Sequence, residues 1–128
     1  RGLVLVDPPF EERDDFQTML DGLIAAHRKW PTGTYVLWYP VKDRAAVARF
    51  RLNLAKSGIR RLLRAELTVR GPASTAAPRE ATFDGTGLVI CNPPWQFADT
   101  LGTLLAGLVP LLAQGPGAAH LIDEIAGE

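Results

Sequence analysis

The sequence predicts an α/β protein whose sheet is mostly parallel and finishes in an antiparallel strand pair. Apolar runs that read as strands alternate with amphipathic segments that read as helices, and short connections join them. Two strands then follow each other with no helix between them. The 128 residues are 47% hydrophobic, enough for the core of one domain, and 14 basic residues balance 14 acidic ones. This neutral balance indicates neither a nucleic acid nor a membrane as partner, so an RNA substrate would need local basic clusters.

The first half of the chain supplies the alternating strands and helices. Residues 2–6 form a continuous apolar run, which predicts a strand covered on both faces, as in a parallel sheet. Apolar side chains recur at helical spacing from about Asp14 to Lys29, and residues 34–39 form a second strand. Asp43 can cap the helix that follows, because its side chain can accept hydrogen bonds from the free N–H groups of the first turn.

The second half of the chain breaks this alternation. Apolar and polar residues alternate over 62–70, which predicts a strand with one wet face near an edge of the sheet. Residues 71–86 are rich in Ala, Pro, Ser, Thr and Gly and predict a long loop. A buried strand over 87–91, a leucine-rich helix over about 97–112 and a last short strand over 118–122 complete the pattern. The strands at 62–70 and 87–91 are expected to pair with each other.

The segment Asp7-Pro8-Pro9-Phe10 directly follows the first predicted strand. Ligand sites of open α/β sheets lie at the carboxyl ends of strands, and this pattern at that place is typical of the amine-binding motif of amino-methyltransferases. The exocyclic amine of adenine is a poor nucleophile because its lone pair is delocalised into the ring. A carboxylate and a backbone carbonyl that each accept one of its N–H groups draw the nitrogen toward tetrahedral geometry. The lone pair can then attack a methyl group.

We therefore predict that Asp7, Pro8 and Phe10 are catalytic. The prolines keep the Pro8 carbonyl aimed, and the aromatic ring stacks on a base that has left its helix or loop. Pro9 is predicted to contact the substrate, as is Tyr39 at the end of the second strand. The alternative interpretation of the motif is a turn that ends the strand and has no chemical role.

A second segment, Asn92-Pro93-Pro94-Trp95, repeats the pattern after a later strand. Three clear predicted strands, at 34–39, 62–70 and 87–91, follow the first segment. Only 33 residues follow Trp95, and no glycine-rich cofactor loop precedes the second segment. The first segment is therefore assigned as catalytic. The second is either structural or a second wall of the substrate cleft, in which case Trp95 contacts the substrate. Of Trp38 and Tyr39, at least one is expected to pack in the core.

The chain resembles the C-terminal part of the bacterial 23S ribosomal RNA adenine-N6 methyltransferases of the RlmJ type. These enzymes have the class I, Rossmann-like methyltransferase fold, whose parallel sheet ends in an antiparallel strand pair. The resemblance implies a cytoplasmic enzyme that uses S-adenosylmethionine to methylate one adenine of 23S ribosomal RNA, with Asp7 beside the cofactor. The family usually has tyrosine at the position of Phe10, and stacking survives this change. The matching blocks are RGLVLVDPPF (1–10), TGTYVLWYPV (32–41), SGIRRLLRAEL (57–67) and GLVICNPPW (87–95).

Residues 1–128 are expected to form a partial catalytic domain. The chain starts with Arg1 and enters an apolar strand within two residues, which indicates a fragment. By the resemblance, the cofactor loop and the ribose-binding acid precede it, so the fragment alone is expected to be inactive. Its uncovered apolar surface is expected to make it self-associate.

Several other features carry no function in this interpretation. Cys91, the single cysteine, is expected to be a buried strand residue, and a chain without a disulfide suits a reducing compartment. His27 and His120 lack ligand-type neighbours, so no metal site is expected. Residues 100–122 contain no Asp, Glu, Lys or Arg, but glycines and prolines interrupt them and argue against a membrane span.

One basic cluster remains as a candidate for contact with RNA phosphates. Lys56, Arg60, Arg61 and Arg64 lie close together in the sequence, although a solvated strand end is the favoured explanation for them. Two other functions stay open. One is a DNA amino-methyltransferase, which uses the same motif chemistry, and the other is a non-catalytic RNA-binding subunit that keeps the fold.

Overall fold

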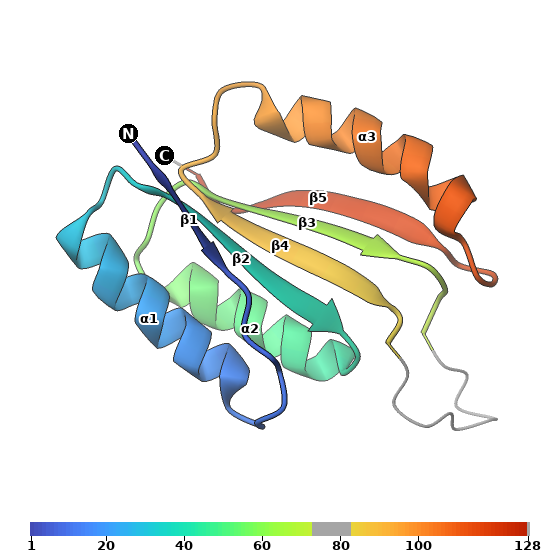
Figure 1. The fold of residues 1–128 in the computed structure, drawn as a ribbon, viewed down its shortest axis with the longest axis horizontal. Coiled ribbons are helices and arrows are strands. Elements are labelled where there is room, and N and C mark those ends of the chain that lie inside the picture. The colour runs from blue at the N-terminus through green and yellow to red at the C-terminus, as the bar shows by residue number, and fades with distance from the viewer. Residues whose placement is uncertain (73–82, 128) are drawn as a thin grey trace.

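The computed structural model describes residues 1–72 and 83–127. Five strands form a single sheet, with two helices on one face and one helix on the other (Figure 1). The elements in chain order are β1 (Leu3–Val6), α1 (Asp15–Lys29), β2 (Thr34–Val41), α2 (Arg44–Lys56), β3 (Leu62–Thr68), β4 (Gly85–Cys91), α3 (Phe97–Leu112) and β5 (Ala119–Ala126).

The sheet is mixed and mostly antiparallel, so the prediction of a mostly parallel sheet is wrong. The strand order is β1-β2-β4-β3-β5, and the β1–β2 ladder is parallel while the other three ladders are antiparallel. The physical reason is that β4 runs in reverse and is inserted between β2 and β3. As a result β3 points the same way as β1 and β2 but touches neither. The predicted pairing of the strands at 62–70 and 87–91 is confirmed, because β3 and β4 are antiparallel neighbours with Leu63 opposite Ile90.

The main core lies between the sheet and the two helices α1 and α2. Alternate residues of β2 point into it, and Leu37 and Tyr39 are both 0% exposed. Gly87 on the neighbouring strand makes room for the Tyr39 ring, because a Cβ there would lie 2.1 Å from its Cζ atom. The helices contribute Met19, Leu20 and Leu23 from α1 and Val47, Phe50 and Leu54 from α2.

The strand β1 is much more exposed than the sequence predicts. Leu3 and Leu5 are 63% and 65% exposed, whereas the apolar run predicts a strand covered on both faces. The reason is that β1 is an edge strand of this sheet, and of its residues only Val6 packs against the main core. A continuous apolar run shows that both faces of the strand are apolar, but it does not show whether other elements pack on them.

The strand β3 is second from an edge of the sheet, which agrees with its predicted position near an edge, although β5 is the edge strand itself. β5 pairs along the open side of β3 and extends to Ala126, beyond the predicted limit of residue 122. The polar side chains of β3 are paired with each other and with β5: Arg64 Nε lies 2.7 Å from Asp123 Oδ1, and Arg64 Nη1 lies 3.5 Å from Glu66 Oε1. Alternation therefore predicts a polar face correctly, but Arg64 and Glu66 on that face are only 13% exposed and make ion pairs.

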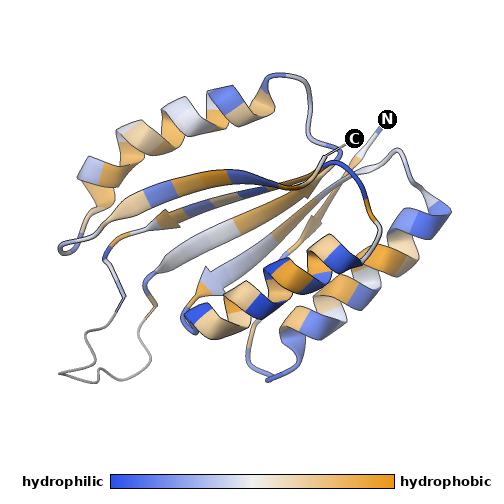
Figure 2. Ribbon diagram, turned by 180° about the vertical axis from the view of Figure 1, so that it is seen from behind, coloured by the Kyte–Doolittle hydropathy of each residue, from blue (hydrophilic) through white to orange (hydrophobic). Residues whose placement is uncertain are grey.

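The helix α3 has the predicted bounds and packs on β5 and β3, but much of its apolar surface stays exposed. It lies on the opposite face of the sheet from α1 and α2 and is mainly apolar in colour (Figure 2). None of its residues is buried, and Leu104, Leu111 and Leu112 are 56%, 78% and 47% exposed. Within the described ranges, no helix has the length and apolar character needed to cross a membrane.

Two further predictions concern the stretch before and within β4. Most of the predicted loop at 71–86 lies outside the described residues, and β4 begins at Gly85 rather than at residue 87. Cys91 is 0% exposed, as predicted for a strand residue. Burial, opposed by the nearby charge of Arg61, raises the pKa of the Cys91 thiol to about 11, so this thiol is held in its protonated form.

Candidate active site

The strands β1, β2 and β3 finish at one end of the sheet, which we call the carboxyl end. Asp7 is the first residue after β1 and is exposed there, next to the half-buried Pro8 and the exposed Pro9. Phe10 adopts a left-handed backbone conformation with φ of 53°. Such a conformation is uncommon for a bulky residue and persists where the surroundings impose it. The four residues thus form a sharply turned segment that presents a carboxylate at the carboxyl end.

Two aromatic side chains hold the Phe10 ring at this turn. Its centroid lies 5.0 Å from that of Phe16 on α1 and 6.0 Å from that of Trp38 on β2, and both contacts are edge-on. Trp38 in turn stacks on Phe83 at 6.4 Å with an interplanar angle of 21°. Phe10 remains half-buried. The ring is therefore oriented by its neighbours while part of it stays accessible.

The alternation of side chains along β2 shows which of Trp38 and Tyr39 lies beside the motif. Val6 pairs with Leu37, so the next residue, Trp38, stands beside the start of the motif and is only half-buried. Tyr39 points to the opposite face and is 0% exposed. It contacts the rings of Phe16 and Phe50 in the core. The predicted substrate contact by Tyr39 has no support in this geometry, and Trp38 is the residue that lies beside Phe10.

The Tyr39 hydroxyl belongs to a buried polar network rather than to the site. It donates a hydrogen bond of 2.6 Å to Glu66 Oε1. Burial first, and the Glu66 charge second, raise the pKa of Tyr39 well above its usual range. Glu66 is also paired with Arg64, and Arg64 joins Asp123, which Arg51 of α2 reaches at 3.2 Å. This network of largely buried side chains joins α2, β2, β3 and β5.

The second segment, Asn92-Pro93-Pro94-Trp95, lies at the other end of the sheet. Because β4 runs in reverse, its last residue Cys91 pairs with Tyr35 and Leu62, near the starts of β2 and β3. Trp95 is 86% exposed there. The structure brings Asp7, Pro8, Pro9 and Phe10 together and does not bring Trp95 to them. A cleft shared by the two segments is therefore not formed within the described residues.

Hydrogen bonds of Asn92 support the structural interpretation of that second segment. Its Nδ2 atom donates to the carbonyl oxygens of Pro31 and Gly33, each at 2.8 Å. Its own carbonyl accepts from the Thr34 hydroxyl at 3.2 Å. Asn92 has a φ of 54°, a left-handed value that asparagine tolerates better than most residues. The segment thus fastens the end of β4 to the turn before β2.

The predicted basic cluster also lies away from Asp7. Arg60 and Arg61 precede β3 at the end of the sheet where that strand begins. Arg61 donates a hydrogen bond to the Pro93 carbonyl at 3.3 Å. The Arg64 side chain is only 13% exposed and is paired with Asp123, so it is not available to phosphate in this arrangement.

Phe83 and Asp84 lie at the carboxyl end just before β4 and were not predicted as site residues from the sequence. Asp84 is 5% exposed and lies 3.6 Å and 3.7 Å from the guanidinium groups of Arg44 and Arg70. Its backbone N–H donates to the Val41 carbonyl at 2.8 Å. These contacts anchor Phe83 beside Trp38. Their only signal in the sequence is an aromatic and an acidic residue before an apolar strand, which is too common to be specific.

The chemistry of the carboxyl end suits a cationic or amine-bearing group. Asp7 supplies an exposed carboxylate at the end of β1, and the aromatic side chains around Phe10 supply apolar surface. A carboxylate fits a cofactor that carries positive charge. In the parts of the chain that the structure describes, no group of three or more His, Cys, Asp or Glu side chains could hold a metal ion.

The fold and the site define an α/β protein with a mixed sheet and a proline-rich motif at the carboxyl end of an edge strand. The family model described as ribosomal RNA large subunit methyltransferase D, RlmJ, matches residues 1–122. The chain belongs to this RlmJ family of ribosomal RNA large subunit methyltransferases, which confirms the resemblance at the level of the family.

Individual proteins show the same similarity. The chain is 36% identical over 114 residues to ribosomal RNA large subunit methyltransferase J of Haemophilus influenzae, covering 89% of this chain and 37% of that protein. It is 36% identical over 108 residues to the protein of that name from Escherichia coli K12, with 84% and 37% covered. The crystal structure of a Legionella pneumophila protein of family DUF519 matches with a TM-score of 0.82 and 27% identity, over 97% of this chain and 43% of that one. The chain thus spans well under half the length of these relatives.

Proposed function

We propose that this chain carries the amine-binding part of a cytoplasmic, S-adenosylmethionine-dependent methyltransferase that methylates the N6 amine of an adenine in 23S ribosomal RNA. The observation that carries the proposal is the exposed Asp7 at the carboxyl end of β1, next to an aromatic ring in a strained turn. The names of the relatives support a large-subunit ribosomal RNA substrate. Residues 1–128 would then form part of a class I catalytic domain.

In this proposal the motif binds and orients the amine. The Asp7 carboxylate accepts one N–H of the adenine amine and the Pro8 carbonyl accepts the other, which localises the nitrogen lone pair. Pro8 and Pro9 fix the backbone, so the carbonyl needs no reorganisation during the reaction. Asp7 also favours the positive charge that grows on nitrogen. S-adenosylmethionine, when bound, supplies the methyl group.

The aromatic residues position and desolvate the base. Phe10 stacks on the adenine ring, and its own orientation is kept by Phe16 and Trp38. Trp38, which lies beside Phe10, takes the role in the pocket wall that the sequence predicted for Tyr39. Pro9, which is exposed, contacts the nucleotide from the outside of the turn.

The test is single-turnover methyl transfer to unmodified 23S ribosomal RNA by the full-length natural protein and its Asp7 variants. Loss of a preorganised polar group that acts in the transition state typically costs roughly 2.7–4 kcal/mol, or about a hundred- to a thousand-fold in rate. Asp7→Ala should show this loss. Asp7→Asn should retain more activity because it still accepts one hydrogen bond. Cofactor binding and thermal melts of each variant separate chemistry from folding.

A matched control is Asn92→Ala in the other proline-containing segment. It should lower the rate of the chemical step less than Asp7→Ala does, because Asn92 lies at the opposite end of the sheet. Near-normal turnover by a folded Asp7→Ala protein would overturn the proposal. Transfer to DNA oligonucleotides but not to ribosomal RNA would favour a DNA amino-methyltransferase. Absence of transfer to either, with intact RNA binding, would favour a non-catalytic subunit.

A further inference from the structure

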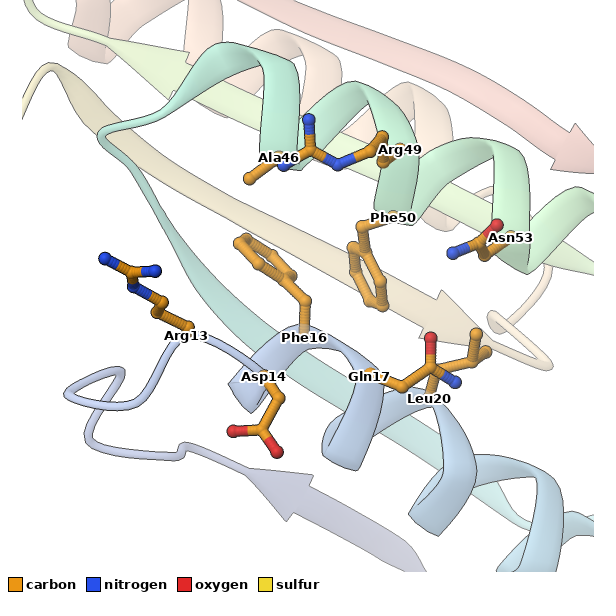
Figure 3. Close-up of a pocket in the computed structure, with 9 residues that line it drawn as sticks. All are labelled: Arg13, Asp14, Phe16, Gln17, Leu20, Ala46, Arg49, Phe50 and Asn53. Carbon is orange, nitrogen blue, oxygen red and sulfur yellow. The ribbon is translucent and has the colours of Figure 1, made fainter.

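A small groove between the first turns of α1 and α2 lies close to the Asp7 motif (Figure 3). It encloses about 160 Å³. Figure 3 shows Phe16 and Phe50 facing each other between the two helices, with Arg13 on the α1 side and Arg49 on the α2 side. Its lining includes Arg13, Phe16, Gln17, Arg49, Phe50 and Asn53.

Arg13 and Arg49 of this groove differ from the arginines elsewhere in the molecule that make ion pairs. Arg44, Arg51, Arg64 and Arg70 each lie within 4.0 Å of a carboxylate. Within residues 1–72 and 83–127, Arg13 and Arg49 are the groove's cations and neither makes an ion pair. Both are exposed. Exposed guanidinium groups without a carboxylate partner can bind phosphate without first breaking an ion pair.

The acidic residues nearby do not neutralise this pair. Asp14 also lines the groove, but its carboxylate points away from Arg13 in Figure 3. Glu11 and Glu12 precede Arg13 in the chain and are not part of the lining. The balanced net charge of the chain means that RNA must be held by local positive charge, and the groove supplies it.

Direct packing connects the groove to the amine-binding motif. Phe16 forms one wall of the groove, and its ring centroid lies 5.0 Å from that of Phe10. On its other side Phe16 packs against Phe50 at 4.9 Å. Only two residues separate Phe10 from Arg13 in the chain. A strand of RNA whose target base stacks on Phe10 therefore has its neighbouring phosphates within reach of this groove.

We propose that the groove between α1 and α2 binds the sugar-phosphate backbone of the RNA next to the target adenine, through Arg13 and Arg49. The inference rests on the proposed function and adds to it a second contact surface. The backbone is the ligand rather than a base, because the Phe50 ring is buried and packs against Phe16, so it is not open to stacking by a base. Such contacts position RNA without reading its sequence.

The experiment compares Arg13→Ala/Arg49→Ala with a charge-matched control, Arg28→Ala/Lys29→Ala, at the far end of α1. Binding of the full-length natural protein to unmodified 23S ribosomal RNA, transcribed in vitro, is measured over a range of salt concentrations. The groove variant should bind more weakly at low salt, and its salt dependence should flatten by about 1.4 in log–log slope, as for two lost phosphate contacts on single-stranded RNA. The control variant should keep the wild-type slope. Arg13→Lys/Arg49→Lys should keep most of the salt dependence, because it keeps both charges.

The outcomes separate this inference from the proposed function. An unchanged RNA affinity and an unchanged salt dependence in a folded Arg13→Ala/Arg49→Ala protein, while wild type still methylates the RNA, would overturn the proposed role of the groove. The proposed function would then still stand. An equal loss in the Arg28→Ala/Lys29→Ala control would also overturn the role of the groove, because it would show a general charge effect. If wild-type protein neither binds nor methylates the RNA, the proposed function itself fails.

Discussion

At the scale of single residues, Asn92 shows how one side chain can fix the end of a strand. It donates two hydrogen bonds to backbone carbonyls and holds a left-handed φ of 54°. Asn92→Ala should therefore lower the free energy of unfolding by roughly 1–3 kcal/mol, because it leaves the carbonyls without these donors and puts a Cβ-bearing residue with no polar group in a strained conformation. Urea denaturation followed by circular dichroism measures this change.

Asn92→Gly is the control for the backbone part of that effect. Glycine tolerates the left-handed conformation but cannot donate the two hydrogen bonds. It should lie between wild type and Asn92→Ala in stability. A wild-type midpoint for Asn92→Ala would contradict the structural role of this residue.

The residue letters place each motif directly after a strand, but they do not show at which end of the sheet the second motif lies. Both segments read as a polar residue, two prolines and an aromatic, but the left-handed residue is Phe10 in one and Asn92 in the other. The direction of β4, and so the end of the sheet at which its motif lies, depends on pairing with strands far away in the chain. Similarly, alternation shows that Trp38 and Tyr39 face opposite ways. Only the position of α1 and α2 shows which of these two faces is covered.

At the scale of elements, the helices were predicted closely because their limits are set by local chemistry. Asp43 Oδ1 accepts hydrogen bonds from the N–H groups of Ala45 and Ala46 at 3.0 and 3.1 Å. Strand positions in the sheet were predicted less well. The pattern of β3 encodes a polar face, but the pairing of Arg64 with Asp123, 59 residues later, could not be seen in it.

The cap of α2 gives a prediction with a control in the same molecule. Asp43→Ala should destabilise the protein by about 0.5–2 kcal/mol, because two N–H groups of the first turn lose their acceptor. Asp14 stands at the same position before α1 but makes no capping hydrogen bond. Asp14→Ala should therefore change the thermal midpoint much less. Equal shifts for the two variants would show that capping by Asp43 is not what stabilises α2.

At the scale of the whole molecule, one face of the sheet is well covered, whereas the other is buried over β3 but exposed at the edge strand β1. Leu3 and Leu5 on β1 and Leu111 on α3 are all more than half exposed. An apolar edge strand is a template for pairing with another chain. The 128-residue chain should therefore self-associate through β1 as its concentration rises, as measured by sedimentation equilibrium.

Lysine substitutions distinguish the contact surface. Leu3→Lys/Leu5→Lys should give a monomer, because charge on an edge strand opposes pairing. Leu111→Lys, which changes an exposed leucine of α3, should leave the association of β1 intact. A wild-type chain that stays monomeric at the highest concentration reached would rule out the expected self-association.

The burial of Cys91 turns the single thiol into a reporter of sheet opening. The residue lies at the end of β4, between β2 and β3, and its pKa of about 11 keeps it protonated near neutral pH. In an unfolded chain a thiol has a pKa of about 8.5 and reacts as the thiolate. An alkylating reagent should thus modify Cys91 only in molecules whose central strands have separated. Since the folded state holds the proton more tightly, raising the pH from about 8.5 toward 11 should favour the opened chain and speed the labelling further.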